Sequence, residues 1–254
     1  MSIPQEKLDR LATMSLDHSA HITFDDGHCP MELVAWLNGE NHGDSPACTD
    51  PAIATFVRHW SDSMGQDDRD KFIRPLLIRL VGTASTDEIR DQRSLMALDW
   101  SIRESTPAWL ELNTDLMVHA GKLRDLPEIL GRKQAWGCVE VVRAARDAAR
   151  SAASSPADSA ASSAAHSAAS SAARSAASYA AHSAARFAAS SAAYSAARSA
   201  AYYAASSAAY YAAGSAANYA ASSAGLNGID IQPATMSLQA SAARLLDRMI
   251  SATE

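Results

Sequence analysis

Cysteine and lysine are scarce in this chain, and the common catalytic motifs are missing. Three cysteines in 254 residues are too few for the disulfide framework of a secreted domain. The N-terminus, MSIPQEKLDRLATM, carries charges where a signal peptide has an apolar run. The sequence contains no Gly-rich phosphate loop, no G-x-S-x-G and no H-E-x-x-H motif. We therefore expect a cytoplasmic protein, and no motif favours an enzyme.

Aliphatic residues are absent from one long segment. Residues 143–222, here called the repeat block, read in frame as 20 tetrads with alanine at positions two and three, apart from Pro156. The block contains no Leu, Ile, Val or Met, but it holds all seven tyrosines, whereas all five tryptophans precede it. This partition predicts four parts. They are a head over residues 1–142, the repeat block as a helical tail, a linker over 223–235 and an amphipathic helix over 236–251.

Strand-like alternation is missing from the head, where only HITF resembles a strand, and helix signals recur instead. Asp50 precedes Pro51 as a candidate N-cap, and Thr86 caps another candidate helix. One helical face after Pro51 is apolar at positions i, i+3, i+4 and i+7 (Ile53, Phe56, Val57 and Trp60). The sequence therefore predicts an all-α protein with a small multi-helix head.

Further helix boundaries follow from glycine and proline. MELVAWLNGE predicts a short helix that ends before Gly39. Another helix is expected to begin at Thr106 and to end near Gly121. Pro75 lies inside a third helical pattern, where it should kink or split the helix, because proline lacks the N–H that the helix needs.

Charge divides between the parts of the chain. The head carries 23 acidic and 14 basic side chains, whereas the repeat block carries six arginines and two aspartates. An acidic head disfavours nucleic acid as its partner. Binding of nucleic acid through arginines and tyrosines of the repeat block is kept as an alternative. Within the head, Asp99 and Arg103 are spaced four apart, which predicts an ion pair on one helical face.

One cluster in the head is a candidate metal or thiol site: Cys29, His42 and Cys48. Each cysteine lies just before a predicted helix N-terminus, a position that lowers a thiol pKa. Three interpretations stay open, namely buried thiols in a small core, a zinc site, and a reactive or paired thiol. The spacing differs from the C-x2-C of a zinc finger. No other cofactor is expected.

The head resembles a family of bacterial and phage-encoded proteins in four blocks: CPMELVAWLNGE, PACTDPAIATFVRHWSDSM, RPLLIRLVGT and LMALDWSIRESTPAWLEL. Members of that family are similar in order too, with such a head followed by a variable run of alanine-rich fours. The resemblance implies that Cys29 and Cys48 belong to the design of the head. It implies a virion location if the chain is phage-encoded, and it implies no activity.

The tetrad period has a geometric consequence. Alanine favours helix, and four residues turn a helix by about 400°, so each alanine pair is rotated by about 40° from the last. The alanine seam thus winds right-handedly, unlike the seam of a heptad coiled coil. This disfavours an ordinary coiled coil and favours close packing of helices through small residues.

Tyrosines flank the alanine seam in the later tetrads. They give large contact areas with a polar end, which suits an interaction surface (Tyr194, Tyr202, Tyr203, Tyr210, Tyr211 and Tyr219). A membrane span is disfavoured, because the uncharged segment after residue 198 is rich in serine and lacks Leu, Ile and Val before Leu226.

Taken together, these patterns favour a non-enzymatic structural or interaction protein. The head would dock a partner, and the repeat block would act as a spacer or oligomerisation rod for a homo-oligomer or another protein. A metal-binding or thiol-based enzyme or sensor at Cys29, His42 and Cys48 is the alternative. The C-terminal amphipathic helix needs a surface, for which the head, the repeat block and a second subunit are all candidates.

Overall fold

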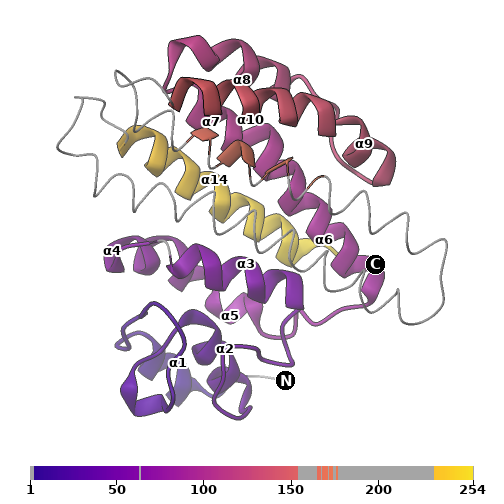
Figure 1. The fold of residues 1–254 in the computed structure, drawn as a ribbon. Coiled ribbons are helices and arrows are strands. Elements are labelled where there is room, and N and C mark those ends of the chain that lie inside the picture. Colours follow the sequence, from indigo (N-terminus) through magenta and orange to yellow (C-terminus); the bar gives the residue numbers. More distant parts are fainter. Residues whose placement is uncertain are drawn as a thin grey trace.

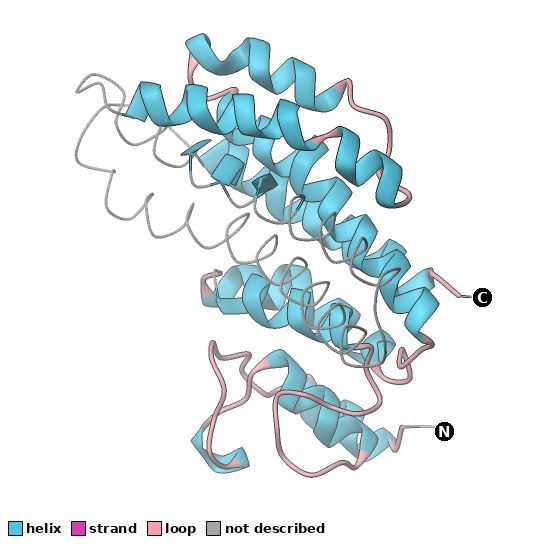
Figure 2. Ribbon diagram, turned by 45° about the vertical axis from the view of Figure 1, so that its right-hand side comes forward, coloured by secondary structure: helices cyan, strands magenta, loops and turns pink. Residues whose placement is uncertain are grey.

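The computed structural model describes residues 3–62, 64–153 and 232–253, together with eight residues between 165 and 176. All regular secondary structure in these residues is helical, as Figure 2 shows, and no strand occurs among them. The prediction of an all-α protein is therefore confirmed for the described part of the chain.

The N-terminal helices lie together at one end of the molecule (Figure 1). They are α1 (Gln5–Leu11), the short 3₁₀ turn η1 (Phe24–Asp26) and α2 (Pro30–Asn38). α2 ends as predicted, because Gly39 adopts φ +76°, a left-handed conformation that a residue with a side chain rarely takes. Its N-cap is Cys29, whose sulfur accepts a hydrogen bond from the Glu32 N–H.

The next helix, α3 (Pro51–Asp62), starts at the predicted Asp50–Pro51 boundary, and the Asp50 carboxylate accepts a hydrogen bond of 2.9 Å from the Ala52 N–H. The segment around Pro75 is split, as predicted. It forms α4 (Gln66–Asp68), the π-turn η2 (Arg69–Ile73), the 3₁₀ turn η3 (Arg74–Leu76) and α5 (Leu77–Leu80). These changes of helix type accommodate the proline ring, which an unbroken α-helix excludes.

The predicted helix from Thr106 to near Gly121 begins at the expected residue, but its extent and its end are wrong. α6 (Asp87–Trp100), capped by Thr86 as expected, continues through the π-turn η4 (Ser101–Ser105) into α7 (Thr106–Leu110). The wider turn makes room for Pro107, and the Thr106 hydroxyl donates to the Ser101 carbonyl at 2.7 Å. The chain breaks after α7 and resumes in η5 (Thr114–Leu116) and α8 (Met117–Arg124), which passes Gly121.

Two helices complete the upper layer in Figure 1: α9 (Arg132–Gly137) and α10 (Val139–Ala153). α10 packs beside α8 and buries one face of its helix. The expected junction between head and repeat block, after residue 142, lies inside α10, which runs through it without interruption.

The last helix, α14 (Gln232–Ser251), lies between the upper helices and α3 (Figure 1). It contacts α3, η2, α6 and α7, so the head is the surface that receives it. Its predicted apolar face is fully buried (Leu238, Ala242, Leu245, Leu246 and Met249). The helix begins four residues before the predicted position 236, because Pro233 falls in the first turn, where no N–H is required.

Candidate functional site

The structure places Cys29 in the core, where only 4% of its surface is exposed. Burial raises the pKa of its thiol to about 12, although the sulfur accepts the Glu32 N–H at the start of α2. The expectation that the helix N-terminus lowers this pKa is therefore wrong. Loss of solvent outweighs the helix dipole at this position.

Cys48 lies near the carboxylate of Glu40. Its N–H donates to Glu40 Oε1 at 2.9 Å, and its sulfur is 3.8 Å from the Thr49 hydroxyl oxygen. Partial burial and the neighbouring Glu40 raise the pKa of this thiol as well. The N-cap of α3 is Asp50 rather than Cys48, which explains why the helix does not activate the thiol.

His42 lies near the Glu32 carboxylate, which also accepts the Cys29 N–H. Its Nε2 lies 3.0 Å from the His21 carbonyl oxygen and 3.6 Å from Glu32 Oε1. Glu32 is fully buried and also accepts hydrogen bonds from the His21 N–H, the His21 ring and the Cys29 N–H. Burial opposes its ionisation, but these hydrogen bonds prevail and hold the pKa of Glu32 below its ordinary value.

The three predicted ligands are thus divided between two carboxylates. Cys29 and His42 meet at Glu32, whereas Cys48 meets Glu40. Among the described residues, no group of three or more His, Cys, Asp or Glu side chains is arranged to hold a metal ion. Zinc at this position stays an untested prediction, and the geometry around Glu32 instead pins the 17–28 segment onto α2.

Thiol labelling tests this description of the cysteines. In the folded protein at pH 8, we expect Cys29 and Cys138 to react with a maleimide far more slowly than in the denatured chain, because both are buried and their pKa values are raised to about 12 and about 11. Partly exposed Cys48 is the internal reference and should react first. Peptide mass spectrometry over time measures each rate. Rapid labelling of Cys29 in the folded protein would contradict its burial.

A second polar site in the described residues is the docking site of α14, meaning the residues of the head that contact this helix. Two buried tryptophans donate to polar side chains of α14. The Trp60 indole N–H donates to the Gln239 side-chain oxygen. The Trp100 indole N–H donates to the Ser241 hydroxyl at 2.8 Å, and that hydroxyl in turn donates to the Glu104 carboxylate. These bonds fix the rotation and the register of α14, since any slip leaves buried polar groups unpaired.

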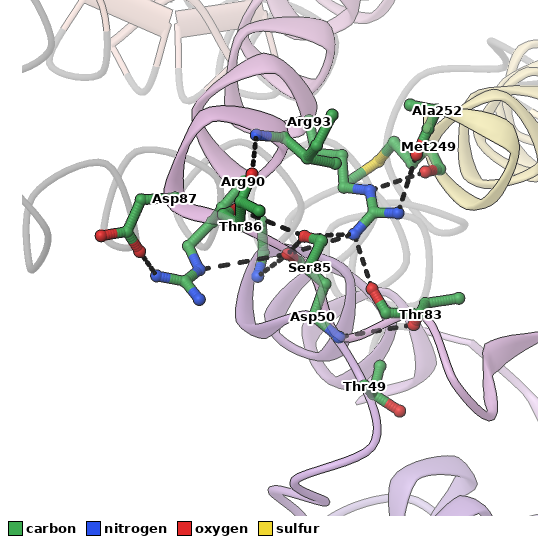
Figure 3. Close-up of polar contacts among 12 residues, drawn as sticks. Thr49, Asp50, Thr83, Ser85, Thr86, Asp87, Arg90, Arg93, Met249 and Ala252 are labelled. Carbon is green, nitrogen blue, oxygen red and sulfur yellow. Dashed lines mark hydrogen bonds and ion pairs between the residues drawn. The ribbon is translucent and has the colours of Figure 1, made fainter. Parts of the chain in front are cut away.

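Arg93 binds the last turn of α14 (Figure 3). Its Nε donates to the Met249 carbonyl at 2.8 Å and its Nη2 to the Ala252 carbonyl at 3.0 Å. Carbonyls at a helix C-terminus have no partner within the helix, so a cation there supplies both hydrogen bonds and charge. Arg93 is 2% exposed, which makes this an internal cap.

The same guanidinium joins α14 to the start of α3. Nη1 of Arg93 lies 3.1 Å from Asp50 Oδ2 and donates to the Thr83 carbonyl at 2.7 Å. Ser85 donates to Asp50 Oδ2 at 2.5 Å, and the Asp50 N–H donates to the Thr83 hydroxyl. Figure 3 shows these side chains converging from three segments of the chain. Asp50 thus caps α3 with one oxygen and holds Arg93 with the other.

The first part of the repeat block joins the same core. α10 buries Val142, Ala145 and Ala149 on one face, and these residues belong to one hydrophobic cluster with alanines further along the block (Ala165, Ala168, Ala172, Ala173 and Ala176). His166 Nδ1 lies 3.4 Å from the Arg146 carbonyl oxygen. Alanine lets helix backbones approach closely, so small residues suit this position in the core. The six tyrosines predicted as an interaction surface lie outside the described residues.

Sequence reasoning missed the polar groups of this site. Its predicted ion pair between Asp99 and Arg103 is present at 3.2 Å. The sequence patterns do not indicate Arg93, Gln239 or Ser241 as members of a site. Their signal was available in part, because both polar residues lie next to members of the predicted apolar face of α14. What the sequence could not indicate is which indoles and carbonyls would meet them.

No family model matches the chain, and no curated protein or solved structure matches it either. The resemblance to bacterial and phage-encoded proteins therefore stays a prediction. No described helix combines the length and the hydropathy that a membrane crossing requires.

Proposed function

We propose that this protein is a non-enzymatic scaffold that displays the repeat block for association with a second copy of the chain. The observation that supports the proposal is that both flanks of the repeat block are built into one core. α10 enters the block through the buried face of Val142, Ala145 and Ala149, and α14 follows it with a fully buried apolar face. The block is therefore an insertion in the helical domain.

The positions of the two flanks suit display. Figure 1 shows that α10 ends and α14 begins at the same end of the helical domain. The entropy of closing a loop grows only slowly with its length. A domain that holds both ends of an insertion can therefore carry many tetrads, and tetrads beyond the buried alanines, which extend to Ala176, can be gained or lost at little cost to its core.

The sequence of the block supplies the contact chemistry. Tyrosine provides large apolar area together with a hydroxyl, and it is enriched at protein interfaces. All seven tyrosines of the chain lie in the repeat block, and the acidic head contains none. We infer that tyrosines, rather than the weakly basic charge of the block, carry the association.

Removing the six tyrosines should reduce the mass of the particle in solution. We expect light scattering to show an oligomer for the full chain and a monomer for a variant with serine at all six positions (Tyr194, Tyr202, Tyr203, Tyr210, Tyr211 and Tyr219). The reason is that serine cannot bury comparable apolar area.

The matched control replaces the same six residues with phenylalanine. This variant keeps the ring area and should retain the association. Both variants should unfold at the temperature of the unchanged chain, since the core of the head contains no tyrosine. An unchanged chain that is monomeric at all concentrations, or a serine variant with the same mass as the unchanged chain, would refute the proposal.

A further inference from the structure

A cavity of about 290 Å³ opens between α6, the segment that links α8 to α9, and α14. Each of these elements contributes to its wall (Gln92, Leu95, Met96 and Asp99 from α6, Glu128, Ile129 and Leu130 from the linking segment, and Arg248 from α14). Its size lies near the lower end of the roughly 300–1,000 Å³ that ligand pockets occupy, so it suits a small metabolite rather than a large one.

The inner wall of the cavity is apolar on two sides. Leu95 and Ile129 are buried, with 8% and 1% of their surfaces exposed, and Met96 is half-buried beside them. Leu130 stands at the mouth and is 68% exposed. An apolar ligand group that covers these side chains gains free energy in proportion to the apolar surface removed from water.

One carboxylate is fixed in the wall. Asp99 is 8% exposed, its Oδ1 accepts the Ile129 N–H at 2.9 Å, and both of its oxygens lie 3.2 Å from Arg103 Nη1. These contacts hold the carboxylate in place and leave it an acceptor in the cavity wall, because an ionised carboxylate has about four acceptor positions.

The cavity is lined by exposed side chains of both signs of charge. The side chains of Arg248, Glu128 and Gln92 are exposed, and among the described residues none of the three makes a hydrogen bond or ion pair. With Asp99 balanced by Arg103, the cavity offers one cationic and one anionic group at its mouth. A ligand that bears a single charge could pair with only one of these two groups.

We propose that this cavity binds a small zwitterionic amino acid with an apolar side chain. Arg248 takes the carboxylate of the ligand, and Glu128 and Asp99 take its ammonium group. The apolar side chain lies against Leu95 and Ile129. Because α14 supplies the guanidinium, the ligand stabilises the docked position of this helix, and binding raises the temperature of unfolding.

The experiment uses the full chain and three probes of matched shape. L-leucine carries both charges, 3-methylbutylamine lacks the carboxylate, and 4-methylpentanoate lacks the ammonium group. We expect L-leucine to bind with a dissociation constant on the order of millimolar or below and to raise the unfolding temperature. Each single-charge probe should bind at least about tenfold more weakly, which corresponds to the loss of one charge-assisted contact. Calorimetric titration and thermal unfolding measure both effects.

Two variants localise the binding. Arg248→Gln should weaken L-leucine about tenfold and leave the weak binding of 3-methylbutylamine unchanged. Arg244→Gln lies one turn earlier on α14, outside the cavity wall, and should bind L-leucine normally. Absence of binding of L-leucine, L-methionine and L-phenylalanine to the full chain overturns the proposal. So does equal binding of the amine and L-leucine, or unchanged binding by Arg248→Gln. These results do not depend on the repeat block, so they are separable from the test of self-association.

Discussion

Replacing Arg93 with methionine is expected to lower the free energy of unfolding by about 3–5 kcal/mol, the usual cost of removing one partner from a buried ion pair. The Asp50 side chain is fully buried, and its carboxylate would lose the nearer of its two arginine partners, at 3.1 Å, and keep only Arg90, whose Nε lies 4.0 Å away. The carbonyls of Met249 and Ala252 would lose their cap as well. Methionine matches the length of the arginine stem, so the change removes charge and hydrogen bonds more than volume. Urea unfolding followed by tryptophan fluorescence measures the effect.

The matched control is Arg79→Gln. Arg79 pairs with Asp247 of α14, but both side chains are about half exposed (45% and 53%), and pairs of this kind contribute only about 0–1 kcal/mol. Both arginines connect the head to α14, so the difference between them isolates burial. Equal and small losses for Arg93→Met and Arg79→Gln would contradict the assignment of Arg93 as an internal cap.

A second substitution tests the cause. In Asp50→Asn/Arg93→Met the buried carboxylate that lost its nearer arginine is gone, so part of the loss should be recovered relative to Arg93→Met alone. The asparagine can still cap α3, because its side-chain oxygen accepts the Ala52 N–H as the aspartate does. A double variant that is less stable than either single variant would show that the loss of this ion pair at the buried carboxylate is not the main cause.

Local features of the fold were predictable because a few neighbouring residues determine them. The start of α3 at Pro51 needs only Asp50 before it, and the end of α2 needs only Gly39 after it. The split at Pro75 follows from one missing N–H. The extent of the helix that begins at Thr106 was less predictable. α7 ends after Leu110, and the π-turn η4 joins its start directly to α6. Ile102 and Trp109 are buried in the core there, and their burial involves residues far away in the chain.

The candidate site was less predictable because it depends on residues far apart in the chain. Trp60 meets Gln239 and Arg93 meets Ala252, contacts between segments separated by the whole repeat block. Periodicity located the apolar face of α14 but could not choose among the three surfaces that could cover it. The prediction of a lowered thiol pKa was wrong for a similar reason. The sequence indicates the N-terminus of α2, but it does not indicate that Cys29 is buried.

Truncation after residue 231 should abolish cooperative folding of the head. α14 fills the centre of the core with a fully buried apolar face, and it also supplies the partners of the Trp60 and Trp100 indoles. The truncated chain would expose both tryptophans, which are 1% and 2% exposed in the folded protein. We expect a red-shifted tryptophan emission and the loss of near-ultraviolet circular dichroism. A truncated chain that unfolds cooperatively at the original temperature would show that α14 is an accessory.

A point substitution and an internal deletion sharpen this last prediction. Leu245→Ala should cost about 2–5 kcal/mol, because it leaves a cavity at a fully buried position, whereas Arg244→Ala, beside it on the exposed face, should stay within about 0.5 kcal/mol. Replacing residues 177–231 with a flexible linker of about 20 residues, which reaches about 25 Å, keeps α14 and the buried alanines up to Ala176 and should preserve cooperative unfolding. The internal deletion removes more residues than the truncation but should cost less stability. The core needs α14, and only the truncation removes this helix.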